Sequence, residues 1–166
     1  MMSSMRASVR TRRKHQRGFS LMELLIVIAI ILIILTIALP HFSKAQQNAR
    51  EMGAVATIRT INSMETQYMS QFGHYASSLA QLGPPAGAGA AEGPEAAGLI
   101  PGSLAGGTTG GYKYAVTQTP TGYAISAVPS QFGTTGRRTF YSDQSGVVRE
   151  NWGADPATAQ SPEAGK

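Results

Sequence analysis

The chain has 166 residues, no cysteine, and a net charge of +5 from 14 basic and 9 acidic residues. The lack of cysteine excludes a disulfide framework. The sequence pI of about 9.8 is typical of nucleic-acid-binding proteins. However, residues 19–166 carry 8 basic and 9 acidic residues, so nucleic-acid binding is not favoured for that part. The remaining six basic residues precede it: Arg6, Arg10, Arg12, Arg13, Lys14 and Arg17.

Residues 19–39 form a long apolar run directly after this basic segment. From Leu24 to Leu39 there is no charge, and only Thr36 is polar. As a helix, the 21 residues 19–39 would be about 31 Å long, enough to cross a bilayer. Because the basic residues lie on one flank only, the N-terminus is expected to be cytoplasmic and the rest of the chain to lie outside. An ionisable residue at the mouth of such a run, Glu23, is a functional candidate.

The residues RGFSLMELL, 17–25, resemble the N-terminus of type IV pilins and of the related pseudopilins of type II secretion. The resemblance covers residues 17 to about 75. It implies that residues 1–18 are a basic leader peptide and that a prepilin peptidase/methyltransferase cuts between Gly18 and Phe19. Phe19 would then be N-methylated, and Glu23, as the fifth residue of the mature chain, would take part in assembly.

Two other interpretations of the N-terminus remain open. A basic segment, an apolar segment and the small residues around Ser43 and Ala45 also fit an ordinary secretory signal peptide. The apolar run is longer than the usual 7 to 15 residues, and a glutamate within it is unfavourable unless it is used. The second interpretation is a plain single-span anchor in which Glu23 has no role.

The helix is expected to continue beyond the membrane. Pro40 is the candidate breaker, because proline removes a backbone hydrogen bond and kinks a helix; the resemblance implies local melting there in an assembled fibre. Residues 19–45 form the membrane and assembly half, and a helix over 46–75 begins the globular domain, 46–152. Its buried face is predicted to be Met52, Val55, Ile58, Ile61, Met64, Tyr68, Phe72 and Tyr75. Its solvent face is predicted to be Gln47, Arg50, Glu51, Asn62 and Glu65.

The sequence after the predicted helix indicates a loop followed by a sheet. Residues 83–111 are rich in glycine and proline and are predicted to be a loop. Residues 112–150 alternate between polar and apolar and are separated by turn residues, which predicts an antiparallel sheet of about four strands. Residues 153–166 are expected to be a disordered tail. The fold class is therefore α+β, type IV pilin-like, with a long N-terminal helix packed on the sheet.

Few residues are candidates for catalysis or for binding a metal or a cofactor. Asp143, in the sequence SDQSG, is a weak calcium candidate, since one acidic side chain is too few for a convincing site; an aspartate bonded to its own turn backbone is favoured. The three histidines are far apart in sequence, and no hydrolase motif is present. No cofactor and no other metal site are expected. Lys113, Arg137, Arg138 and Arg149 could form a small basic patch, although a solvated sheet face is favoured.

These observations favour a structural protein over an enzyme. The leading hypothesis is a type IV pilus subunit that polymerises through its N-terminal helix, with a pseudopilin of a type II secretion system as the alternative and a membrane-anchored exported enzyme or binding module as a third class. The expected partners are the prepilin peptidase/methyltransferase, identical or related subunits, and an inner-membrane assembly platform. The expected location is the bacterial inner membrane, then a pilus or pseudopilus.

Overall fold

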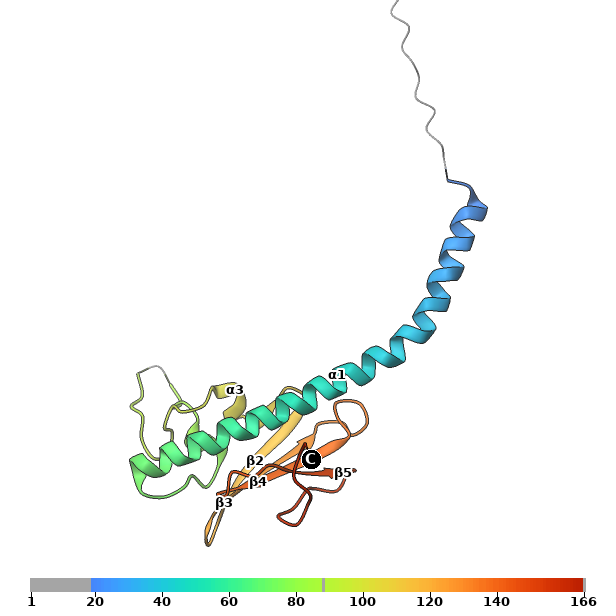
Figure 1. The fold of residues 1–166 in the computed structure, drawn as a ribbon. Coiled ribbons are helices and arrows are strands. Elements are labelled where there is room, and N and C mark those ends of the chain that lie inside the picture. The colour runs from blue at the N-terminus through green and yellow to red at the C-terminus, as the bar shows by residue number, and fades with distance from the viewer. Residues whose placement is uncertain (1–18, 88, 166) are drawn as a thin grey trace, which may run out of the picture. The chain divides into compact units, whose positions relative to one another are not determined.

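The computed structural model describes residues 19–87 and 89–165. The chain forms two compact units, Met1–Leu39 and Pro40–Lys166. Helix α1, Leu21–Phe72, runs through both and is the first element (Figure 1). The others, in chain order, are α2 (Leu79–Leu82), α3 (Gly102–Ala105), β1 (Thr108–Thr109), β2 (Tyr112–Thr119), β3 (Gly122–Pro129), β4 (Arg138–Asp143) and β5 (Arg149–Trp152). The expected α+β class is confirmed.

The strands form one antiparallel sheet in the order β1-β2-β3-β4-β5. The predicted antiparallel sheet of about four strands is confirmed, and it has five strands because of one additional short strand. The additional strand lies in the glycine-rich segment that the sequence assigns to a loop. Gly110 and Gly111 have φ values of +60° and +84°. This left-handed conformation favours glycine and turns the chain so that Thr109 pairs with Tyr112.

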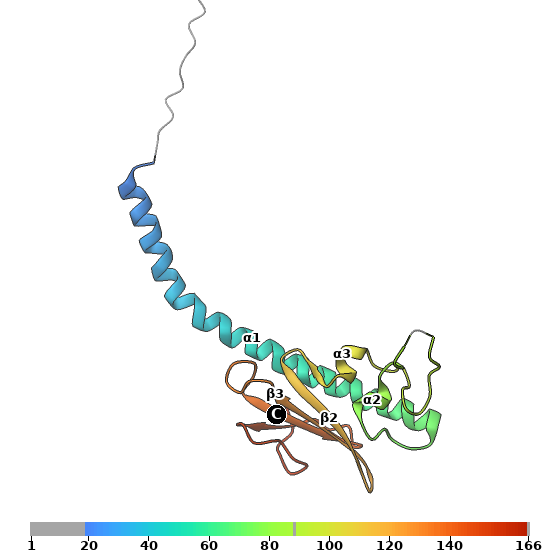
Figure 2. The same ribbon diagram turned by 180° about the vertical axis from the view of Figure 1, so that it is seen from behind.

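The second half of α1 lies along one face of the sheet (Figures 1 and 2). The predicted stripe is confirmed in part. Ile58, Ile61 and Tyr68 are buried, and four more of its residues are partly buried against the core: Val55, Met64, Phe72 and Tyr75. Met52 is 70% exposed, whereas Glu51 and Glu65, which were expected in solvent, are 1% and 0% exposed. The buried residues follow steps of three and four, which keeps them on one side of a helix. They are Glu51, Ala54, Ile58, Ile61, Glu65 and Tyr68.

After α1 the chain folds back beside the helix. Gly73, with φ +78°, follows the last helical residue and donates its N–H to Met69 O at 2.9 Å, so α1 ends three residues before the predicted residue 75. The following segment buries Leu82 and Ile100 in the main core and includes α2 and α3 (Figure 2). The predicted loop, 83–111, is thus partly packed on the domain.

The C-terminal segment is ordered, and the prediction of a disordered tail was wrong. Ala164 N donates to Val148 O, and Glu150 N donates to Pro162 O, both at 2.9 Å. Ala157 is buried. β5 is an edge strand whose outward backbone groups need partners, and residues 157–164 supply some of them. The segment therefore covers a sheet edge.

Candidate functional site

The start of α1 holds the residues that the sequence singles out. Phe19 and Ser20 precede the helix, which begins at Leu21. Ser20 accepts hydrogen bonds from Met22 N through its hydroxyl, at 3.3 Å, and from Leu24 N through its carbonyl, at 3.1 Å. These bonds satisfy two amides of the first turn. Gly18 and the rest of the predicted leader lie outside the described residues.

Glu23 lies in the first turn of α1. A carboxylate at this position is stabilised by the positive end of the helix dipole. Glu23 is exposed, and within the described residues no side chain or amide pairs with it. Phe19, which would carry the new α-amino group after cleavage, is 81% exposed. Both groups are therefore accessible to another copy of the chain.

The apolar part of α1 is not buried by any other part of the described chain. Among the described residues, α1 alone is long and apolar enough to cross a membrane, with a mean hydropathy of 3.1 over 18 residues and none of that window buried. The hydroxyl of Thr36 donates to Ile33 O at 2.7 Å, so this polar group is satisfied within the helix. Pro40 lies inside α1 and does not end it. It removes one amide donor at the boundary between the two units.

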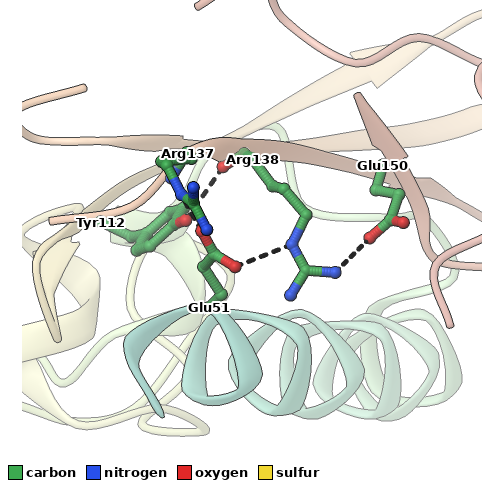
Figure 3. Close-up of polar contacts among 5 residues, drawn as sticks. All are labelled: Glu51, Tyr112, Arg137, Arg138 and Glu150. Carbon is green, nitrogen blue, oxygen red and sulfur yellow. Dashed lines mark hydrogen bonds and ion pairs between the residues drawn. The ribbon is translucent and has the colours of Figure 1, made fainter. Parts of the chain in front are cut away.

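A second group of polar residues fastens α1 to the sheet (Figure 3). The buried carboxylate of Glu51 accepts from Arg137 N at 2.7 Å and from Arg138 Nε at 2.8 Å. Arg138 also pairs through a second guanidinium nitrogen with Glu150 at 2.7 Å. Tyr112 donates its hydroxyl to Arg138 O at 2.9 Å.

This ionic group joins α1 to β4 and β5, because Arg138 opens β4 and Glu150 belongs to β5. Charge-assisted hydrogen bonds are the stronger kind, and here they join two buried carboxylates to the half-buried guanidinium of Arg138. The chain has no cysteine to close this region. The Glu51–Arg138–Glu150 contacts supply a link between the helix and the last strands, and sequence reasoning missed them because it placed Glu51 in solvent.

Glu65 is a buried carboxylate with incomplete partners. One oxygen accepts from Ala76 N at 2.9 Å, and the other has no hydrogen bond within the described residues. Burial raises the pKa of Glu65 from 4.5 to about 7, although the hydrogen bond from Ala76 lowers it in part. The folded domain therefore holds a proton on Glu65 at pH values where the unfolded chain has lost it.

We expect the stability of the domain to depend on pH through Glu65. Since its folded pKa, about 7, exceeds the usual 4.5, its contribution is complete below pH 4.5 and is lost as pH rises through 7. The loss amounts to about 3 kcal/mol of unfolding free energy. Glu65→Gln keeps an acceptor for Ala76 N and cannot ionise, so urea unfolding of the full chain in detergent, followed by circular dichroism, should lose this pH dependence.

The control for this experiment is Glu95→Gln, because Glu95 is exposed and the chemical change is the same. It should leave the pH profile of unfolding as in the wild type. At about pH 8 the Glu65→Gln variant should be more stable than the wild type, since it no longer buries a charge. Parallel profiles for the wild type and Glu65→Gln would contradict the assignment.

Asp143 lies in the turn between β4 and β5. Its carboxylate accepts from Ser145 N at 2.9 Å, which is the turn bond that the sequence favours. Within residues 19–87 and 89–165, no three histidine or acidic side chains come together as a ligand set. The arrangement therefore explains Asp143 as a turn residue and gives no support to its weak candidacy as a calcium ligand.

Known proteins and one known family match the sequence of this chain in part, including its N-terminal residues. The family described as "Prokaryotic N-terminal methylation motif" matches residues 13–39. The type IV major pilin protein PilA of Myxococcus xanthus is 33% identical over 69 residues, 42% of this chain and 31% of that protein. The competence protein ComGC of Halalkalibacterium halodurans is 39% identical over 54 residues, 32% of this chain and 53% of that protein. No solved structure matches the chain significantly.

These similarities concern part of each protein. The chain spans about a third to a half of the length of the curated relatives it matches. The expected resemblance to type IV pilins is confirmed over that part, and the structure adds a long apolar helix joined to a domain with a five-stranded antiparallel sheet. Residues 13–39 thus match the prokaryotic N-terminal methylation motif, and the chain is similar in part to a type IV major pilin and to a competence protein.

Proposed function

We propose that the chain is a structural subunit of a type IV pilus, cleaved by a prepilin peptidase and polymerised through α1. The observation that carries the proposal is the start of this helix. Phe19 and Glu23 are exposed at the start of the apolar run, and no other part of the described chain buries that run. A surface of this kind fits either lipid or the same surface on other copies of the chain.

The proposed assembly depends on two charged groups at the start of α1. Cleavage after Gly18 would create an α-amino group on Phe19, which carries a positive charge within an apolar environment. Glu23 of a neighbouring subunit supplies the opposite charge, and each charge offsets the desolvation of the other. Because the pair forms at one axial offset between helices, it also sets the register of the filament. Pro40, at the boundary between the units, is the proposed site of local helix extension in the fibre.

The partners in this scheme are the prepilin peptidase/methyltransferase, other copies of the chain or related subunits, and an inner-membrane assembly platform. Before assembly the subunit would be a single-pass protein of the bacterial inner membrane with a cytoplasmic N-terminus, and afterwards part of an extracellular filament. The role is structural rather than enzymatic. A pseudopilin of a type II secretion system would use the same N-terminal chemistry and end in a periplasmic pseudopilus.

The test is mass spectrometry of purified surface filaments and of the membrane fraction. We expect the chain to be present in the filaments and to begin with N-methylated Phe19, since the resemblance of the residues RGFSLME to type IV pilins implies cleavage after Gly18. A mature chain beginning near Gln46 would indicate an ordinary signal peptide instead. Methylated chain found in the membrane but absent from surface filaments would favour the pseudopilin.

A further inference from the structure

One end of the sheet in the Pro40–Lys166 unit, which we call the basal end, lies beside the first turns of α1 in that unit. It consists of the Gly110–Gly111 turn, the β3–β4 loop over residues 130–137, and the end of β5 at Trp152. Gln47 of α1 donates its side-chain amide to Gly133 O in that loop at 2.6 Å. In Figure 1 the loop is orange and lies next to α1, at the opposite end of the sheet from the β2–β3 turn.

The basal end presents two aromatic side chains to solvent. Phe132 is 51% exposed and Trp152 is 63% exposed. The loop that carries Phe132 is held by its own hydrogen bonds: Thr135 N donates to Gln131 O at 2.9 Å, and Gly133 N donates to Gly136 O at 2.8 Å. Trp152 lies against the guanidinium of Arg138, 5.0 Å from the ring centre. The rings of Phe132 and Trp152 are thus exposed on segments that are held by their own contacts within the domain.

The same end carries an excess of positive charge, on the exposed Lys44, Lys113 and Arg137 and on the half-buried Arg50. Lys44 lies one turn before Gln47 on the same side of α1. The side chain of Arg50, with Thr135, borders Gly111 at 3.3 and 3.2 Å from the position that a Cβ there would take. Lys113 is the second residue of β2, and Arg137 precedes β4; both are exposed. Within the described residues, none of these four side chains has an ionic partner.

Acidic residues are distributed in the opposite way. Glu51 and Glu150 at the basal end are buried and paired with Arg138, and Asp155 is the exposed acid there among the described residues. At the other end, Asp143 closes β4. Glu92 and Glu95 flank Pro94, whose carbonyl accepts from Tyr68 near the end of α1. The domain therefore has a basic, aromatic end and an acidic end.

The basal end is also the end closest along α1 to the apolar run. Gln47 follows Pro40 by seven residues, which is about 10 Å of helix rise. The headgroup layer extends about 5 to 8 Å beyond the hydrocarbon on each side of a bilayer. Lysine, arginine and aromatic side chains reach several ångströms from their backbone, and tryptophan and tyrosine are enriched at this interface.

We propose that the basal end docks on anionic lipid headgroups, with Lys44, Arg50, Lys113 and Arg137 facing the phosphates and Phe132 and Trp152 entering the interface. The proposal rests on the proposed membrane insertion of residues 19–39 and not on filament formation. Docking fixes the orientation of the Pro40–Lys166 unit on the bilayer before assembly. The attraction is electrostatic, so it weakens as ionic strength rises.

The experiment uses the full chain in nanodiscs of phosphatidylcholine, with or without phosphatidylglycerol, and a fraction of lipid brominated near the headgroup. Trp152 is the single tryptophan of the chain and reports contact through quenching of its fluorescence. We expect stronger quenching in the anionic discs, declining with added salt. A control reporter is Gln118→Trp in a Trp152→Phe background, because Gln118 is exposed near the β2–β3 turn; it should not be quenched.

Two variants with the same charge change test the position of the basic residues. Arg137→Gln removes an exposed charge at the basal end and should lower the docking equilibrium about fivefold; adding Lys113→Gln should bring the loss to roughly 30-fold. Arg59→Gln removes an exposed charge farther along α1 and should have little effect. Equal effects of Arg59→Gln and Arg137→Gln would overturn the proposal.

Other outcomes identify other occupants of this surface. Quenching that is the same in neutral and anionic discs, or that depends on protein concentration, would overturn lipid docking and point to a second copy of the chain. Charge-dependent binding of a short DNA duplex without lipid quenching would point to nucleic acid. Failure of the chain to insert into either disc would contradict the proposed function, whereas insertion without Trp152 quenching contradicts this inference alone.

Discussion

Replacing Glu23 with alanine or glutamine is expected to reduce filament formation severely while membrane insertion and cleavage after Gly18 continue. Glu23 lies in the first turn of α1 and has no partner within the described residues, so its removal leaves the fold of a single chain intact. In a filament, the α-amino group of Phe19 on a neighbouring subunit would lose its counter-charge. Leaving one charge of a buried pair uncompensated costs about 3 to 5 kcal/mol.

The measurements are filament yield by electron microscopy and cleavage by mass spectrometry in the same cells. Glu65→Gln is the matched control, because it makes the same chemical change in the Pro40–Lys166 unit. It should assemble normally. Wild-type filament yield from Glu23→Ala, with cleavage confirmed, would refute the pairing mechanism. Restored assembly in Glu23→Asp would support it, since the charge is retained.

The second large effect is expected at Arg138. Arg138→Leu leaves the buried carboxylates of Glu51 and Glu150 without their common cation. The unfolding free energy should fall by about 3 to 5 kcal/mol, the cost of breaking a buried ion pair. Urea unfolding of the full chain in detergent, followed by circular dichroism, measures the change. The loss should shrink in acid, because the two carboxylates can then take up protons.

Arg149→Leu is the control for Arg138→Leu. Arg149 is half-buried in β5 and makes one hydrogen bond, to Ser161 O at 3.0 Å, so its loss should cost about 1 kcal/mol. Combining Arg138→Leu with Glu51→Leu and Glu150→Leu should recover stability, since an apolar replacement of a whole ionic group is often neutral or stabilising. An unfolding midpoint for Arg138→Leu equal to that of the wild type would show that these contacts contribute nothing.

The broad architecture could be predicted from the sequence because its signals are local. A run of 16 residues without charge fixes the apolar half of α1, and strict alternation from Tyr112 onward fixes β2 and β3. The match to the methylation motif also depends on residues that are close in sequence. The short strand β1 lacked such a signal, because a two-residue strand is defined by its partner and not by its own pattern.

The buried face of α1 was predicted in part, since Ile58, Ile61 and Tyr68 are buried. Met52, Glu51 and Glu65 were misplaced for a geometric reason. The predicted stripe begins with four steps of three residues, and each step of three falls about 60° short of a full turn, so the stripe winds around the helix. Glu51, Ile58 and Glu65 are seven residues apart, which keeps them within about 20° of one side at each step. The prediction placed Glu51 and Glu65 in solvent because acidic residues are rarely buried.

The contacts of the tail were beyond sequence reasoning for a different reason. Residues 157–164 contain few apolar side chains, and their attachment to β5 uses backbone groups that every residue carries. Glu51 and Arg138 are 87 positions apart, so the sequence does not show that they meet. By contrast, Asp143 and Ser145 bond across two residues, and the composition of the turn was enough to suggest it.

The bonds of Glu51 to the start of β4 have a mechanical consequence. A load applied along α1 would shear the helix across the sheet, and a slip of one heptad, about 10 Å, would bring Ile58 to the position of Glu51. That slip would separate Glu51 from Arg138 of β4. Glu51 therefore opposes sliding of α1 across the sheet, and we expect the domain to resist tension along its helix.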